Sequence, residues 1–286
     1  MSGTARGTYR ARPDGKGRNV IGQGILAILR AFLVASLIAL PALMLPGADP
    51  EMAQMIALVG LLVGGLVFAE YRSSYPSFIE FRSAPPYNRM RFAMGFAIVA
   101  GVTVVCAGKA GPLAAALGTA LDFPFSPVRL MLLVLPADAP AADAAVIRTA
   151  AALAYALSLG AVCLFVPILR LVDWPLRNGA FNVWVNLPMF DPTAGGDILR
   201  RMKREAHVNV ALGFLMPFLV PALLLVAPSG PSLLRLEEPQ TVTWVIALWG
   251  ILPAGLIMRG IALIRISDLI AEKRRRAYRQ ANLSVA

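Results

Sequence analysis

The sequence has very few of the side chains that bind metals or form disulfides. It contains one histidine, His207, and two cysteines, Cys106 and Cys163, which both lie in apolar stretches. A structural zinc site uses about four Cys or His ligands and a catalytic one about three protein ligands. A haem held between two histidines needs a second histidine, and two cysteines do not make a disulfide framework. We therefore expect no metal site and no disulfide scaffold, and we predict no cofactor.

Charge is also scarce. Charged residues make up 15% of the chain, whereas 58% of its residues are apolar and the mean hydropathy is +0.68. A soluble domain carries about 25% charged residues, and a disordered chain has low hydrophobicity. The composition therefore excludes both classes and predicts a membrane protein with several spans.

Six apolar stretches come close to the length of about 20 residues that a helix needs to cross about 30 Å of hydrocarbon. They lack the alternation of a barrel strand, and a helix satisfies its own backbone groups in lipid. The predicted spans are residues 25–45, 52–69, 92–107, 149–169, 208–227 and 242–264. We predict an all-α fold, a polytopic membrane helix bundle with six transmembrane helices. A basic N-terminal tail (residues 1–24) and a basic C-terminal tail (residues 265–286) flank this single membrane domain, residues 25–264.

The basic residues predict the orientation. Six spans place both tails and the loops 70–91 and 170–207 on one side of the membrane, and these four segments carry most of the 27 Lys and Arg residues. The opposite side holds four basic residues, Lys109, Arg129, Arg148 and Arg235. Because cytoplasmic loops are enriched in Lys and Arg, both termini are expected in the cytoplasm. The abundance of Arg and Ala suggests a bacterial protein of the inner membrane. The formal net charge of +11 is then explained by orientation and anionic lipid, and no nucleic-acid partner is expected.

Two segments have alternative interpretations. The first apolar stretch, preceded by basic residues and followed by Pro46-Gly47-Ala48, also resembles a cleavable signal peptide. Its length and the regular charge pattern favour a retained span. Residues 108–148 contain five prolines, a potential short helix at 112–123 and an apolar segment at 128–135. We expect this region to lie on the outer membrane surface, and a re-entrant loop is the alternative.

Small residues four positions apart predict close helix packing. Span two contains Gly60-x-x-x-Gly64, and spans three and four contain similar small faces that end at Gly101 and Gly160. We expect these faces to pack within one chain, with dimerisation as the alternative. Pro217 and Pro221 lie on one face of span five and are the best candidates for a functional bend.

The predicted spans have no Asp or Glu in their middles, and Arg30 and Arg259 lie near their cytoplasmic ends. A proton relay would need such acids, whereas binding or transport of an apolar solute would not. No phosphate-binding loop, nucleophile elbow or zinc-binding helix motif is present. Asp191, Asp197 and His207 are the candidates for a cytoplasmic active site, but Asp197 or Thr193 is expected to cap the helix that follows. We therefore predict that the protein is not an enzyme.

The cytoplasmic loops combine aromatic residues with arginine. Tyr and Arg are enriched at interface hot spots, and the alternative is an aromatic belt at the membrane surface. The candidate partner-binding residues are Tyr71, Arg72, Tyr75, Arg82, Tyr87, Arg89, Trp174 and Trp184.

These observations predict a scaffold, assembly or accessory subunit whose partner is another membrane protein or a second copy of the chain. The alternative function is a transporter or channel-type protein for an apolar or lipid-like solute. Residues 263–279 contain no Gly or Pro, so span six should continue as a helix or bend at Arg265. Its candidate contacts with anionic membrane lipid are Lys273, Arg274, Arg275 and Arg276.

Overall fold

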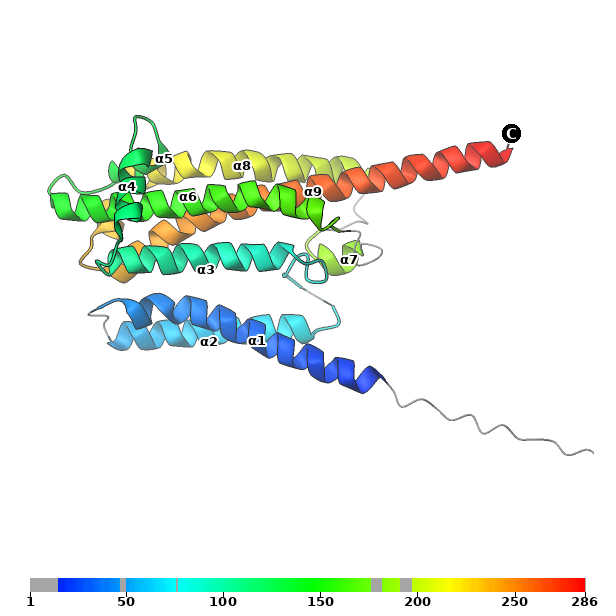
Figure 1. Ribbon diagram of the computed structural model, residues 1–286, viewed down its shortest axis with the longest axis horizontal. Coiled ribbons are helices and arrows are strands. Elements are labelled where there is room, and N and C mark those ends of the chain that lie inside the picture. Colours follow the sequence, from blue (N-terminus) through cyan, green and yellow to red (C-terminus); the bar gives the residue numbers. More distant parts are fainter. Residues whose placement is uncertain (1–14, 47–49, 76, 176–181, 191–196, 286) are drawn as a thin grey trace, which may run out of the picture.

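The computed structural model describes residues 15–46, 50–75, 77–175, 182–190 and 197–285 (Figure 1). Within these ranges the protein is all-helical, without strands, and six helices are long and apolar enough to cross a membrane. They are α1 (Gly15–Met44), α2 (Pro50–Arg72), α3 (Tyr87–Cys106), α6 (Ala141–Leu171), α8 (Ile198–Val226) and α9 (Pro239–Val285). The prediction of an all-α protein with six candidate spans is thereby confirmed.

The long helices form two groups. Helices α1 and α2 make a hairpin, and α3, α6, α8 and α9 form a bundle in which α9 contacts each of the other three (Figure 1). The hairpin contacts the bundle mainly between α1 and α3, with a smaller contact between α1 and α9. Helix α1 therefore makes most of the contact between the hairpin and the bundle.

Most of the helices extend beyond the predicted spans. Helix α6 begins eight residues before the predicted start at residue 149, and α8 begins ten before residue 208. Hydropathy identifies the segment that lies in hydrocarbon, whereas a helix can continue through polar turns outside it. Asp197 caps α8 as expected, because its side chain accepts a hydrogen bond from the Leu199 N–H at 3.2 Å. Helix α9 continues past Arg265 to Val285, which confirms the helical prediction for the C-terminal tail.

Two of the helix faces formed by small residues pack against other helices of the same chain. A Cβ atom added at Gly60 or Gly64 would lie 3.1 or 3.0 Å from a carbonyl oxygen of α1, that of Ala35 or Ala31. Gly101 packs in the same close way against Leu153 of α6, whereas Gly160 has no neighbour within 4 Å of its added Cβ. The Gly60–Gly64 face therefore holds the hairpin together, as expected for packing within one chain.

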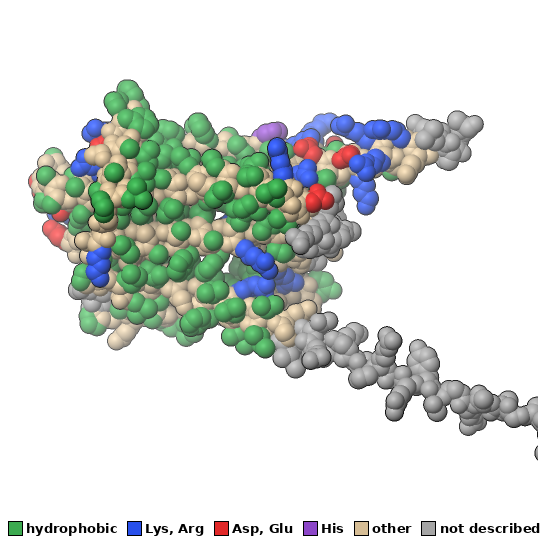
Figure 2. Space-filling model, viewed as in Figure 1, with side chains coloured by type: hydrophobic (Ala, Val, Ile, Leu, Met, Phe, Trp, Pro, Cys, Tyr) green, Lys and Arg blue, Asp and Glu red, His purple; other side chains and the backbone are tan. Residues whose placement is uncertain are grey.

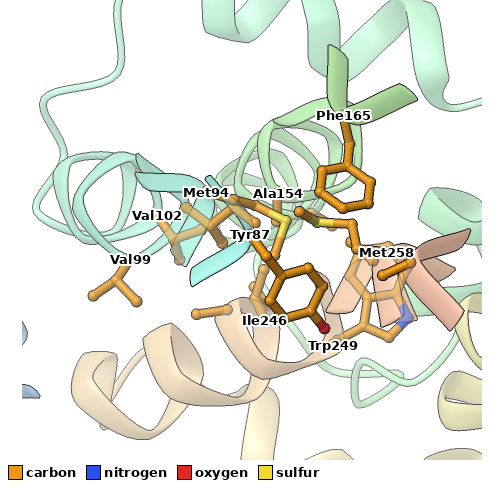
Figure 3. Packing of buried hydrophobic residues seen from close by; sticks show 14 of the residues in the cluster. Tyr87, Met94, Val99, Val102, Ala154, Phe165, Ile246, Trp249 and Met258 are labelled. Atoms are coloured by element: carbon orange, nitrogen blue, oxygen red, sulfur yellow. The ribbon is translucent and has the colours of Figure 1, made fainter. Parts of the chain in front are cut away.

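The core lies between α3, α6 and α9. Tyr87 of α3, Phe165 of α6 and Met258 of α9 are fully buried (Figure 3). Because these side chains come from three helices, their burial fixes the bundle from which the basic loops extend.

The prolines of α8 contribute to the same packing. Pro221 has no N–H, so the Pro217 carbonyl lacks its usual helical donor. The indole N–H of Trp249 in α9 donates to that carbonyl at 3.1 Å. The carbonyl that Pro221 leaves without a helical donor is thus used in a contact between α8 and α9.

Short helices close one end of the bundle. They are α4 (Pro112–Leu121), α5 (Pro127–Leu132) and the 3₁₀ helix η2 (Pro231–Leu234). Val128 and Met131 of α5 are fully buried, and α5 contacts α6 and α8. Residues 128–135 therefore pack onto the end of the bundle through α5, and their position relative to the membrane surface stays a prediction.

The opposite end carries the basic loops. Helix α7 (Val183–Asn186) and the C-terminal part of α9 lie there, away from α4 and α5 (Figure 1). The loops rich in basic residues and the loops with few of them therefore lie at opposite ends of the structure.

Candidate functional site

A cavity of ≈ 920 Å³ lies between the α1–α2 hairpin and the bundle. Its walls are apolar over one part and polar over another. The apolar wall comes from α1, α2, α3 and α9 and includes Leu26, Leu29, Leu33, Val34, Val67, Phe92 and Leu256. The polar part includes Arg30, Tyr71, Glu80, Asn88, Arg89, Arg91, Glu205, Asn209 and Arg259. Figure 2 shows basic side chains beside the hollow between the two groups of helices.

The polar part of the cavity lies at the end of the spans that carries the basic loops. With a rise of about 1.5 Å per residue, Arg259 is about 30 Å along α9 from Pro239. Glu205 is about 31 Å from the far end of α8 by the same rise. These lengths match the thickness of a bilayer's hydrocarbon core. The polar side chains therefore lie about one hydrocarbon thickness from the far ends of α8 and α9, and Leu33, Val67 and Leu256 of the apolar wall lie about one turn further into the spans.

An ion-pair cluster joins three distant segments of the chain at this level. The Arg259 guanidinium donates to both Glu80 carboxylate oxygens at 2.6 and 2.7 Å. It also donates to Glu205 Oε1 at 2.6 Å. The Glu80 side chain is 8% exposed and that of Arg259 19%. Such a partly buried, bidentate pair fixes the loop of Glu80 against α8 and α9.

The loop that carries Glu80 is ordered by its own hydrogen bonds. Glu70 Oε1 accepts from the backbone N–H groups of residues 77, 78 and 79 at 2.6 to 3.0 Å. Arg82 donates to the carbonyl oxygens of Glu70 and Ser73. Phe81, at φ 53°, donates its backbone N–H to the Asn186 carbonyl at 2.7 Å. The loop before α3 and the loop that contains α7 are thus connected, and Glu80 is held in position.

Aromatic packing supports the same loop. The Phe81 ring lies 4.4 Å from the Tyr87 ring and 5.6 Å from the Trp174 ring, measured between centroids. Trp174 also donates its indole N–H to the Ala84 carbonyl at 3.0 Å. Phe81, Tyr87 and Trp174 are at most 1% exposed. These rings therefore form the interior of a folded cap on the bundle.

Aromatic rings also hold two of the arginines of the cavity. The Arg30 guanidinium lies 4.4 Å from the centroid of the Tyr71 ring, and that of Arg91 lies 5.5 Å from the Tyr87 centroid. Within the part of the chain that the structure describes, no carboxylate forms an ion pair with Arg30, Arg89 or Arg91. A cation–π contact orients a guanidinium without neutralising its charge. These three cations therefore remain available to a ligand.

The residues predicted to bind a partner have different positions. Tyr71 and Arg89 line the cavity, and Arg82 is part of the loop hydrogen bonds. Tyr87 and Trp174 are buried, whereas Arg72 and Tyr75 are exposed, Tyr75 to 85%. The Trp184 side chain lies outside the described residues. Some of the predicted residues are buried and others exposed, because the aromatic residues that suit an interface also suit the interior of a folded loop.

Glu80, Glu205 and the pairing role of Arg259 were not predicted. Arg259 is visible in the sequence as a cation near the end of a span, but snorkelling to the interface accounts for it equally well. Its partner Glu80 is 179 positions away, and no local pattern links the two.

The candidates for a cytoplasmic active site are not drawn together. Asp197 caps α8 and pairs with Arg274 at 3.4 Å. His207 is exposed ten residues further along α8, which places the two Cα atoms about 15 Å apart along the helix axis. Asp191 lies outside the described residues. Among the described residues, no group of three or more His, Cys, Asp or Glu side chains is arranged to hold a metal.

No protein-family model matches the chain, and no curated protein and no solved structure is found to be similar to it. The functional argument therefore depends on the cavity and its side chains.

Proposed function

We propose that this chain is a non-enzymatic membrane protein that binds a lipid-like solute in the cavity between the α1–α2 hairpin and the bundle, as part of its transfer or presentation. The observation that carries the proposal is the cavity itself, with its apolar wall within the spans and its cations at the end that bears the basic loops. Ligand pockets of about 300–1,000 Å³ hold drug-sized molecules, and ≈ 920 Å³ is near the top of that range. An amphiphile has the matching distribution of apolar and polar groups.

The proposal includes an orientation. The loops at the end that carries the polar part of the cavity contain most of the basic residues, so the positive-inside rule places this end and both termini in the cytoplasm. We propose a bacterial inner membrane as the location. The solute would then enter from the cytoplasmic leaflet, whose lipid head groups lie at the level of Arg30 and Arg259.

Filling the cavity tests the proposed function. Leu33→Trp combined with Leu256→Trp adds two large side chains to the apolar wall. The matched control combines Leu62→Trp with Leu219→Trp, which are 60% and 48% exposed and do not line the cavity. Binding of a fluorescent uncharged lipid to the purified protein should fall at least about fivefold, or about 1 kcal/mol, in the first variant and stay unchanged in the second, because the two indoles occupy the space that the lipid would fill. Equal binding by both variants would contradict the proposal.

An accessory subunit is the second candidate. The observation that favours it is the C-terminal part of α9, which extends beyond the bundle and exposes Tyr278 to 70% (Figure 1). Its partner would be another membrane protein or a second copy of the chain. Deletion of residues 272–286 should then release a co-purifying protein without changing binding of the lipid probe. Retention of every co-purifying protein would contradict this candidate.

A further inference from the structure

The polar part of the cavity carries more positive charge than its carboxylates neutralise. Four arginines and two glutamates line it, which gives a formal charge of +2. Both glutamates pair with the same arginine, Arg259. Arg30, Arg89 and Arg91 therefore carry the positive charge, and the cluster of Arg259 with the two glutamates has a formal charge of −1.

The helix contacts keep two of these arginines at the cavity. Arg30 stacks on Tyr71 across the α1–α2 hairpin. The Arg91 side chain extends from α3 toward α9, where its guanidinium lies 3.8 Å from the position of a Cβ added at Gly255. Arg89 is on the same first turns of α3 and is exposed. The three cations thus come from two helices that both line the cavity.

Arg30, Arg89 and Arg91 line a cavity that is largely apolar, and a bound anion would satisfy their free donors there. Phosphate and carboxylate groups satisfy guanidinium donors with short, charge-assisted hydrogen bonds. A zwitterionic head group would bring a cation as well as an anion. The carboxylates that could accept that cation, Glu80 and Glu205, are already bound to Arg259 at 2.6 Å. The charges therefore favour a head group with a net negative charge.

We infer that the solute is an anionic amphiphile whose phosphate or carboxylate binds Arg30, Arg89 and Arg91 and whose acyl chain lies against Leu33 and Leu256. This inference rests on the proposed function, because it assigns the head-group chemistry of the same cavity. It requires the apolar and the charged part of the ligand to be on one molecule.

Short-chain lipids test the head-group chemistry. The full-length protein, purified and delipidated in a neutral detergent, is titrated with dioctanoyl phosphatidylglycerol, with dioctanoyl phosphatidylcholine and with inorganic phosphate, and bound ligand is counted by native mass spectrometry. Phosphatidylglycerol should bind at least about tenfold more tightly than phosphatidylcholine, since one nearby cation favours an anionic lipid by about fivefold and three cations favour it by more. Inorganic phosphate should compete only weakly. Equal affinity for the two lipids, or phosphate binding as tight as that of phosphatidylglycerol, would overturn the inference.

Three variants test whether the arginines of the cavity cause the preference for the anionic lipid. Arg30→Gln, Arg89→Gln and Arg91→Gln together should bring the ratio of the two lipid affinities close to one. The corresponding Lys variant should keep most of the preference, and it shows whether charge rather than folding is responsible. The matched control, Arg170→Gln, Arg200→Gln and Arg204→Gln, removes the same charge from exposed positions outside the cavity lining. Where the triple Gln variant does not fold, the single variant Arg89→Gln should still lower the ratio, and an unchanged ratio in a folded variant would refute the inference.

The cavity-filling variant separates the two proposals. If Leu33→Trp with Leu256→Trp blocks both lipids but the protein never prefers the anionic one, the proposed function stands and this inference is wrong. If the filled variant binds both lipids as well as the unmodified protein, the proposed function itself is wrong.

Discussion

Trp249 and Pro221 act on the same backbone carbonyl. Pro221 removes the helical donor to the Pro217 oxygen, and the Trp249 indole replaces it at 3.1 Å. Trp249→Phe should therefore destabilise the protein by about 1–2 kcal/mol, because it leaves a buried carbonyl without a donor. Pro221→Ala restores a backbone N–H at position 221. In that background the cost of Trp249→Phe should fall by about 1 kcal/mol.

Thermal or steric-trapping measurements of unfolding on the four proteins of this double-mutant cycle give the coupling. If the cost of Trp249→Phe is the same with and without Pro221, the indole does not replace the missing backbone donor.

Arg259 is the residue on which the loop, α8 and α9 converge. Arg259→Met would leave Glu80 and Glu205 facing each other without a cation, and removal of one partner of a buried pair costs about 3–5 kcal/mol. Because Glu205 is partly exposed to solvent, we expect the lower end of that range. Arg259→Lys keeps the charge but loses the bidentate geometry, so its cost should be smaller.

Melting temperatures in one detergent rank the two Arg259 variants against the unmodified protein. Arg265→Met is the control, because its contact to Asp173 is longer, at 3.7 Å, and both side chains are exposed. If Arg259→Met melts no lower than this control, the cluster does not stabilise the fold.

At the scale of the helices, the α1–α2 hairpin depends on a close approach at Gly64. A Cβ added there would lie 3.0 Å from the Ala31 carbonyl, whereas one added at Gly65 would meet nothing within 4 Å. Gly64→Leu should destabilise the hairpin by about 1–3 kcal/mol through overpacking, and Gly65→Leu should be close to neutral. Because α1 and α2 form one wall of the cavity, lipid binding should weaken only in the first variant.

Unfolding and binding of the uncharged lipid probe are measured together on these adjacent variants. Equal effects on both properties would mean that Gly64 does not pack against α1.

The sequence predicts the helices better than their contacts. Long apolar stretches identify the six spans because hydrocarbon imposes both length and composition. Charged first turns such as that of α3 escape this criterion, although they belong to the helix. The loops show the larger difference, since aromatic composition alone does not distinguish Tyr87, which is buried, from Tyr75, which is exposed. Arg259 and Glu80 become a site only when α9 and the loop are packed together.

At the scale of the whole molecule, α9 carries a row of exposed basic residues beyond the bundle. Arg274 pairs with Asp197, and Arg276 pairs with Glu272 on its own helix. Such exposed pairs contribute about 1 kcal/mol or less each, so the row has little structural role. Replacement of Lys273, Arg274, Arg275 and Arg276 by Gln should leave the melting temperature nearly unchanged. Attraction to an anionic leaflet is about 1 kcal/mol per residue, so the variant should retain less anionic lipid on purification.

Lipid extraction and mass spectrometry measure that retention, with Arg170→Gln as a control for charge loss elsewhere at the same end. Unchanged anionic lipid in the quadruple variant would restrict the basic row to a role in topology.

The distribution of charge between the two ends predicts which end enters the cytoplasm. Ser73 and Ala277 belong to the end with the basic loops, and Ala110 and Ser229 belong to the opposite end. All four are exposed.

In a background with Cys106→Ala and Cys163→Ala, each of the four is replaced singly by Cys and treated with a membrane-impermeant maleimide. Ala110→Cys and Ser229→Cys should be labelled in intact cells, because the end with few Lys and Arg residues is translocated. Ser73→Cys and Ala277→Cys should be labelled only after the inner membrane is permeabilised. The opposite pattern would place the arginines of the cavity at the outer leaflet and would require the solute to enter from that side, whereas labelling of one residue from each pair in intact cells would contradict the six-span arrangement itself.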